Sequence, residues 1–200
     1  GTLVALAPGD TYLDGYHSPL WFHTQCGGAT RADTVIGGLK ALLARGAAQH
    51  DWVLVHDAAR CLVTSAQIDG LIAECEHDSV GGLLAHKLPD TLKTAITGPT
   101  GVRVASTVDR SDKWLAQTPQ MFRLGSLLDA LNHMGAAATD EASAMEAMGH
   151  RPKLIPGGAH NFKVTYPDDF ALAEAVLMQR GGSATLELFK GKRDNAQPVG

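Results

Sequence analysis

Short apolar runs that alternate with segments of helical periodicity constrain the fold of this chain more than any other feature. The pattern predicts strands at residues 2–7, 20–24, 52–56, 80–84, 153–156 and 162–164. It predicts helices at residues 31–45, 65–76, 124–134 and 140–148, and a last helix that begins at Pro167. Such alternation is typical of an α/β fold. Within it, we expect residues 52–56 to form a central strand of the sheet.

Residues 87–110 break this alternation. Two extended segments, residues 91–96 and 102–108, flank the sequence Gly-Pro-Thr-Gly at residues 98–101. Glycine and proline in this arrangement favour a turn, so the segment is predicted to be a β-hairpin. A hairpin inserted into an α/β pattern often projects from the body, and its exposed edges then seek a partner. We therefore expect a dimerisation arm.

The size and composition of the chain favour one globular domain. Its 200 residues are 44% hydrophobic and 19% charged, a balance that is ordinary for globular proteins. We expect a single domain over residues 1–180. Residues 181–200 are polar and rich in glycine, and they are expected to form a loose C-terminal tail.

Charge, cysteine content and hydropathy argue against several classes of protein. The net charge of −4 makes a nucleic-acid partner unfavourable. Cys26, Cys61 and Cys75 form no CxxC pair, which argues against a disulfide scaffold or zinc site and favours a reducing cytoplasm. No apolar run approaches the roughly 20 residues that a membrane span needs, and residues 2–7 are too short for a signal peptide. We expect a cytoplasmic protein without a membrane partner.

The strongest chemical signal follows the strand predicted at residues 52–56. Asp57 and Arg60 stand at its carboxyl end, which is where open α/β sheets bind ligands. A carboxylate there can hold a divalent metal, and an arginine three residues later can reach a phosphate. An ion pair that only joins the strand to the next helix is the alternative, and the position of the pair favours function.

Other segments carry weaker signals. Gly27 and Gly28 would let the backbone approach a flat base, although a plain turn explains them equally well. Lys163 at a strand end could stabilise phosphate charge, but taken alone it is better explained as a surface lysine. A turn accounts for residues 118–120, and an N-cap accounts for Thr139. Neither glycine-rich phosphate fingerprint occurs, so a nicotinamide dehydrogenase is set aside.

Taken in order, these segments resemble one enzyme family. The matching segments are residues 56–60, 107–110, 118–120, 139–144 and 161–165. Together they resemble the 2-C-methyl-D-erythritol 4-phosphate cytidylyltransferases of the non-mevalonate isoprenoid pathway, over residues 2–178. No single segment is decisive, whereas the ordered set is specific. The resemblance implies a Rossmann-like nucleotidyltransferase sheet with helices on both faces, a projecting β-arm at about residues 87–110, and a homodimer.

The resemblance also implies a reaction and its residues. The phosphate oxygen of a sugar-alcohol phosphate attacks the α-phosphorus of CTP and releases pyrophosphate, which demands positioning and charge neutralisation. Mg²⁺ or another divalent cation is implied beside Asp57. The implied catalytic residues are Asp57, Arg60, Arg110 and Lys163. The implied substrate-binding residues are Arg60, Thr91, Arg110, Thr118 and Thr139, with Thr91 and Arg110 reaching the partner subunit's site. The implied cytidine-binding residues are Gly27, Gly28, Ala29, Thr34 and Ala58.

The chain departs from the family pattern at a few positions. The family begins with a strand and a Gly-rich loop that binds the triphosphate, whereas the given sequence starts after them. We expect that unit to precede Gly1 in the whole protein. Cys61 stands where proline is usual, and Ala29 stands where an acidic residue is common. The segment between Gln120 and Thr139 is slightly short.

Two other functions stay open at this point. A ribitol-5-phosphate cytidylyltransferase would share the fold and the chemistry but use a different acceptor. A non-catalytic dimeric remnant of the fold would keep the arm and bind no CTP.

Overall fold

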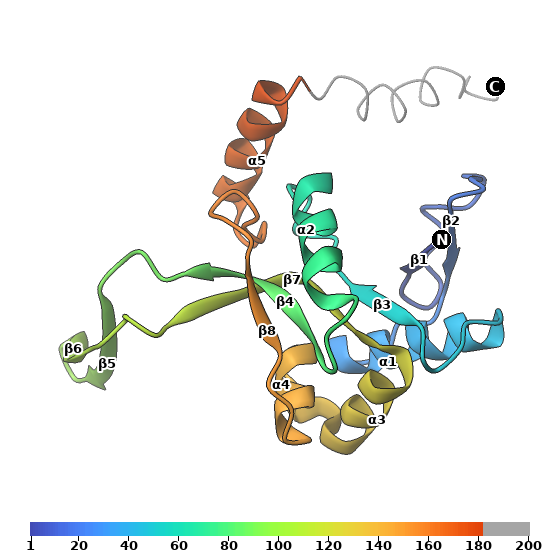
Figure 1. Ribbon diagram of the computed structural model, residues 1–200. Coiled ribbons are helices and arrows are strands. Elements are labelled where there is room, and N and C mark those ends of the chain that lie inside the picture. The colour runs from blue at the N-terminus through green and yellow to red at the C-terminus, as the bar shows by residue number, and fades with distance from the viewer. Residues whose placement is uncertain (182–200) are drawn as a thin grey trace, which may run out of the picture.

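The main sheet of the computed structural model, which describes residues 1–181, has the strand order β3-β7-β4-β8. β7 runs antiparallel to β3 and to β4, and β8 runs parallel to β4. These strands span Trp52–Val55 (β3), Trp114–Arg123 (β7), Gly81–Lys87 (β4) and Lys153–Pro156 (β8). A separate parallel pair is formed by β1 (Thr2–Ala5) and β2 (Trp21–Thr24). Figure 1 shows this pair beside the main sheet.

Helices cover both faces of the main sheet, as predicted. The helices span Arg31–Ala44 (α1), Ser65–Cys75 (α2), Leu124–Met134 (α3), Glu141–Ala147 (α4) and Pro167–Gln179 (α5), with a 3-10 turn at Gly135–Ala137. Leu83 of β4 packs with buried residues of α1, α3 and α4. The next residue, Leu84, packs with Leu71 and Cys75 of α2. Because successive strand side chains point to opposite faces, these two clusters lie on opposite sides of the sheet. The predicted α/β fold is confirmed.

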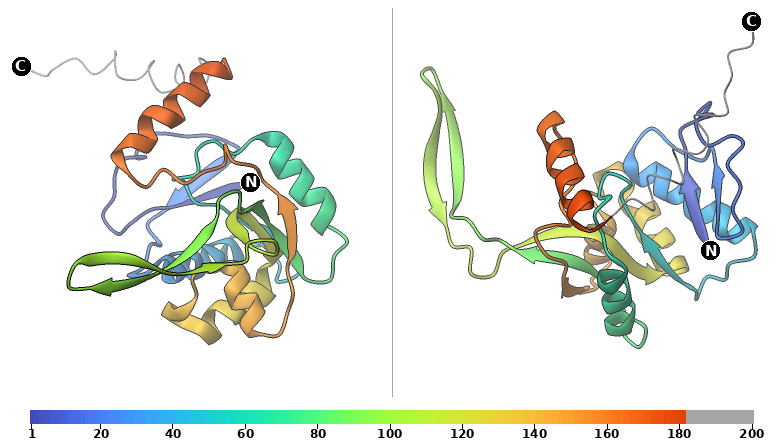
Figure 2. Two further views of the ribbon diagram at one scale, coloured as in Figure 1. Left: turned by 90° about the vertical axis from the view of Figure 1, so that its left-hand side faces the viewer. Right: turned by 90° about the horizontal axis from the view of Figure 1, so that it is seen from above.

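The predicted hairpin is present and projects from the body. It consists of β5 (Leu92–Gly98) and β6 (Gly101–Val108), which pair antiparallel. Figure 2 shows it extending away from the sheet and helices in both views. Gly101 has φ 101°, which favours glycine in the turn. Ile96, Val102 and Val104 are 61%, 70% and 64% exposed, so the arm presents apolar side chains to solvent.

Two predictions about strands are wrong. β3 is not central, because within the described residues it pairs only with β7 and lies at the end of the main sheet. Residues 118–120 lie in β7 rather than in a turn. The pairing of β4 with β7 shifts between Leu83, opposite Gln120, and Ala85, opposite Ala116. Pro119 therefore stands at an irregularity of the ladder, where its missing N–H costs no regular hydrogen bond.

Two further local predictions are corrected. Residues 162–164 do not form a strand, although the Val164 N–H donates to the Ala59 carbonyl at 2.8 Å. Asp140, not Thr139, caps α4: its side chain accepts the Ser143 N–H at 2.8 Å. The predicted tail lies outside the described residues from position 182 onward. No helix within residues 1–181 has both the length and the apolar character that crossing a membrane requires.

Candidate active site

A cavity of about 310 Å³ lies where β3 ends. Five residues that the sequence predicts for the site line it: Asp57, Arg60, Thr118, Thr139 and Lys163. They come from the segment after β3, from β7, from the segment before α4 and from the segment before α5. The fold thus brings together side chains that lie up to 106 positions apart (57 to 163). Arg31, Gln117, Gln120 and Asp140 complete the charged and polar lining.

Asp57 is the most strongly paired carboxylate of the cavity. Its Oδ1 lies 2.9 Å from both Nε and Nη2 of Arg31, and its Oδ2 lies 3.5 Å from Nζ of Lys163. Burial alone would raise the pKa of Asp57, but the charges of Arg31 and Lys163 outweigh it and lower this pKa below its ordinary value. Asp57 is therefore ionised at neutral pH.

Lys163 and Arg60 differ in how far their charges are available. The Lys163 side chain is 46% exposed and makes the 3.5 Å contact to Asp57, so its ammonium can turn toward an anion. Arg60 donates from Nη1 to the Asn161 carbonyl at 2.8 Å and from Nη2 to the Ala116 carbonyl at 3.3 Å. Arg60 is thus held by backbone and lends the cavity a fixed positive charge, whereas Lys163 supplies an adjustable one.

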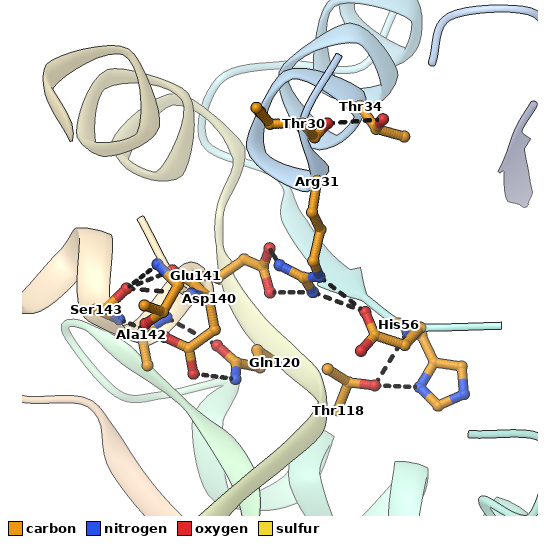
Figure 3. A network of polar contacts seen from close by, with 12 residues as sticks. Thr30, Arg31, Thr34, His56, Thr118, Gln120, Asp140, Glu141, Ala142 and Ser143 are labelled. Atoms are coloured by element: carbon orange, nitrogen blue, oxygen red, sulfur yellow. Dashed lines mark hydrogen bonds and ion pairs between the residues drawn. The ribbon is translucent and has the colours of Figure 1, made fainter. Parts of the chain in front are cut away.

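Thr118 is held by a series of hydrogen bonds through His56 that the sequence did not predict. Nε2 of His56 lies 3.1 Å from the Arg60 carbonyl, which only accepts, so this nitrogen carries the proton. Burial lowers the pKa of His56. The neutral ring therefore accepts at Nδ1 from the Thr118 hydroxyl, 2.9 Å away. The same hydroxyl oxygen accepts the Asp57 N–H at 3.0 Å. Figure 3 shows His56 and Thr118 joined in this way.

Arg31 and Glu141 are the other site residues that the sequence analysis missed. Nη1 and Nη2 of Arg31 donate to the two carboxylate oxygens of Glu141 at 2.6 and 3.0 Å. The Glu141 side chain is 0% exposed. The sequence predicts a first-turn helix acid at this position, and such acids are normally solvated. For Glu141, the only signal in the sequence was its position in the segment 139–144, which matches the family.

The predicted cytidine-binding residues lie near, but do not line, this cavity. The Gly28 N–H donates to Thr34 Oγ1 at 3.1 Å, and the Thr34 hydroxyl donates to the Thr30 carbonyl at 3.0 Å. A Cβ on Gly28 would overlap the Asp33 side chain, so only glycine fits there. Gly27, Gly28, Ala29 and Thr34 thus form the entry to α1, whose first residue is Arg31, and Ala58 follows Asp57.

Thr91 and Arg110 are not brought to Asp57 within one chain. Arg110 lines a separate cavity of about 510 Å³ at the base of the arm, together with Lys87 and Asp109. Its Nη1 donates to the carbonyls of Leu88 and Pro89. Thr91 is exposed, directly before β5. Any role for these residues beside Asp57 requires a second chain.

The donor set around Asp57 fits a metal only together with a ligand's oxygens. Among the described residues, no group of three or more His, Cys, Asp or Glu side chains could hold an ion. Asp57 offers one carboxylate, and both of its oxygens already face cations. Mg²⁺ is often bound by one or two carboxylates plus substrate phosphates. The residues present suit an ion that a nucleotide brings with it.

Comparison with known proteins gives a consistent result. The family model described as 2-C-methyl-D-erythritol 4-phosphate cytidylyltransferase (IspD) matches residues 19–179. The bifunctional enzyme IspD/IspF of Albidiferax ferrireducens is 62% identical over 181 residues, which cover 90% of this chain and 42% of that protein. The 2-C-methyl-D-erythritol 4-phosphate cytidylyltransferase of Burkholderia multivorans is 49% identical over 188 residues, covering 92% and 79%. The chain therefore spans less than half of the bifunctional relative.

Solved structures agree with these sequence matches. The crystal structure of a 4-diphosphocytidyl-2C-methyl-D-erythritol synthase superposes with a TM-score of 0.78 at 43% identity, covering 88% of this chain and 81% of that one. The Francisella tularensis 2-C-methyl-D-erythritol 4-phosphate cytidylyltransferase gives a TM-score of 0.73 at 34% identity, covering 88% and 79%.

Proposed function

This chain belongs to the 2-C-methyl-D-erythritol 4-phosphate cytidylyltransferase family, and we propose that it transfers CMP from CTP to 2-C-methyl-D-erythritol 4-phosphate. The acceptor's phosphate oxygen forms a bond to the α-phosphorus of CTP, and the bond from that phosphorus to the bridging oxygen of pyrophosphate breaks. The products are 4-diphosphocytidyl-2-C-methyl-D-erythritol and pyrophosphate. The protein is then a nucleotidyltransferase of isoprenoid precursor synthesis.

The observation that carries this proposal is the arrangement of cations around Asp57. Arg31, Arg60 and Lys163 line the cavity with the carboxylates of Asp57 and Asp140. Phosphoryl transfer requires positioned cations where negative charge develops, and little covalent chemistry from the protein. Lys163 is the group suited to this task, since its ammonium is half-exposed and only loosely held at 3.5 Å from Asp57.

The other predicted residues receive matching roles. Arg60 contributes a fixed charge toward the acceptor's phosphate, and the Thr118 and Thr139 side chains shape the acceptor site. The backbone at Gly27, Gly28, Ala29 and Ala58, with Thr34 behind it, borders the cytidine. Mg²⁺ or another divalent cation, bound with the triphosphate, would neutralise phosphate charge, and Asp57 is the residue that would hold it.

We extend the proposal to a homodimer formed through the arm. Exposed apolar side chains on β5 and β6 support it, since an apolar projection of this kind is a typical interaction surface. In the dimer, Thr91 and Arg110 of one subunit complete the site around Asp57 of the other. The three cysteines are free, which supports the cytoplasm as the compartment.

Pyrophosphate release tests the function. The purified whole protein is mixed with CTP and Mg²⁺, and methylerythritol phosphate and ribitol phosphate are offered in parallel. We expect release with methylerythritol phosphate alone. Release with ribitol phosphate would instead make the protein a ribitol-5-phosphate cytidylyltransferase. A folded protein that releases pyrophosphate with neither acceptor would be the non-catalytic remnant.

A further inference from the structure

Four charged side chains form an ordered row that leads into the cavity. Its members are Glu141, Arg31, Asp57 and Lys163, and their charges alternate in sign. Arg31 uses Nη1 and Nη2 for Glu141, at 2.6 and 3.0 Å, and Nε and Nη2 for Asp57, both at 2.9 Å. Lys163 follows Asp57 at 3.5 Å. All three guanidinium nitrogens of Arg31 are therefore engaged.

The row runs from a fully buried end at Glu141 to a half-exposed end at Lys163. In order along the row, the side chains of Glu141, Arg31, Asp57 and Lys163 are 0%, 33%, 17% and 46% exposed. A fully buried carboxylate is costly unless it is paired, so Arg31 cannot leave Glu141 without a large penalty. Figure 3 shows Glu141 directed at the Arg31 guanidinium. Glu141 thus fixes the place of Arg31.

The anchor at Glu141 is itself held rigidly. Asp140 caps α4 through the Ser143 N–H, at 2.8 Å. The buried Gln120 of β7 accepts the Ala142 N–H at 2.7 Å and donates to Asp140 Oδ2 at 2.9 Å. The first turn of α4 is therefore tied to the sheet on both sides of Glu141.

We propose that Arg31 is a positioning residue for the transfer reaction, which acts by holding the Asp57 carboxylate in the orientation that places Lys163. With Oδ1 of Asp57 engaged by Arg31, Oδ2 is the oxygen that faces Lys163. Arginine suits this role, since its planar fork can serve two carboxylates along two edges. A lysine at position 31 keeps the charge and loses one of these edges. This inference rests on the proposed function.

Steady-state kinetics of the folded dimer test the proposal. Arg31→Lys is expected to lower kcat by about ten- to a hundredfold, because small misplacements of reacting groups cost this much. We expect KM for CTP to stay within about threefold, since the positioned charge acts in the transition state. Arg123→Lys is the matched control: Arg123 donates to the His50 carbonyl and stacks 3.7 Å from the Trp52 ring centroid, remote from the cavity lining. It should keep kcat.

A second variant shows whether Glu141 acts through Arg31. Glu141→Gln should lower kcat in the wild-type background and have little further effect in the Arg31→Lys background. Both substitutions break the same series of contacts, which runs from Glu141 through Arg31 to Asp57. If Arg31→Lys does not fold, the kcat and KM of the Glu141→Gln single variant test the proposal instead. A folded variant with an unchanged kcat would overturn the proposal. So would a variant whose activity falls through a raised KM and a lowered thermal stability instead of through kcat.

A crystal structure of Arg31→Lys separates this inference from the proposed function. We expect the Asp57 carboxylate to turn and its contact with Lys163 to be lost. If wild-type protein releases no pyrophosphate but the variant shows this change, the proposed function fails and the positioning role stands. If the Asp57–Lys163 contact persists unchanged in the variant, the positioning role is wrong even where the wild type is active.

Discussion

At the scale of single residues, the Thr118 hydroxyl joins two polar groups beside the cavity. It donates to His56 and accepts the N–H of Asp57, while Thr118 is only 4% exposed. We predict that Thr118→Val lowers the free energy of unfolding by about 1–3 kcal/mol, because it leaves buried polar partners unsatisfied. Urea denaturation measures this loss. Thr118→Ser keeps the hydroxyl, and an equal loss in that variant would contradict the explanation.

The sequence predicted the residues of the cavity better than their contacts. Asp57 and Arg60 were identified because they follow a strand, and Thr118, Thr139 and Lys163 because their segments match the family in order. Arg31 and Glu141 were missed, since nothing local distinguishes a buried helix acid from a solvated one. Their pairing joins positions 110 residues apart, and such a contact exists only once the fold is formed.

At the scale of elements, the entry to α5 carries a pH-dependent contact. Oδ2 of Asp169 accepts the N–H groups of Thr165 and Tyr166, both at 2.8 Å. These bonds lower the pKa of Asp169. The stabilisation is therefore present above the unfolded-state pKa of about 3.9 and is lost as the pH falls through the lower folded-state pKa.

Amide hydrogen exchange at Thr165 and Tyr166 tests this contact. After correction for intrinsic rates, we predict that protection of both amides falls as the pH is lowered from neutral through this range. Asp169→Asn should abolish the pH dependence, because the amide side chain does not ionise. Asp168→Asn removes the same charge from the same helical turn as a control, and a similar effect in that variant would implicate net charge instead.

Elements with regular periodicity were predicted well, and β7 was not. The helix Leu124–Met134 and the strand Lys153–Pro156 have the predicted bounds, and the hairpin is confirmed. β7 was missed because Pro119 and polar residues such as Gln117 and Gln120 lack the apolar alternation of a strand. Their side chains are buried by tertiary contacts, and the proline is accommodated by the break in the ladder with β4.

At the scale of the whole molecule, the proposed dimer depends on the arm, and with it the completion of the proposed site. Val102 and Val104 are two residues apart on β6 and so share a face. We predict that the combined variant Val102→Asp and Val104→Asp weakens the dimer by about 2 kcal/mol or more, roughly thirtyfold in Kd. Light scattering over a dilution series measures this change. Thr100→Asp adds charge at the turn instead, and should leave the dimer intact. A dimer that survives the paired substitution would place the interface elsewhere.

A mixing experiment decides whether one site is built from two chains. Lys163→Ala and Arg110→Ala dimers should each be nearly inactive, since each of their sites lacks one cation. Exchange of subunits produces heterodimers in which one site has both residues intact and the other has neither. Because half of the dimers in an equal mixture are mixed and each has one complete site, about a quarter of the wild-type activity should return. If Lys163 and Arg110 served the same site from one chain, every site would still lack one of them. Mixing would then restore nothing, and the arm would only hold the subunits together.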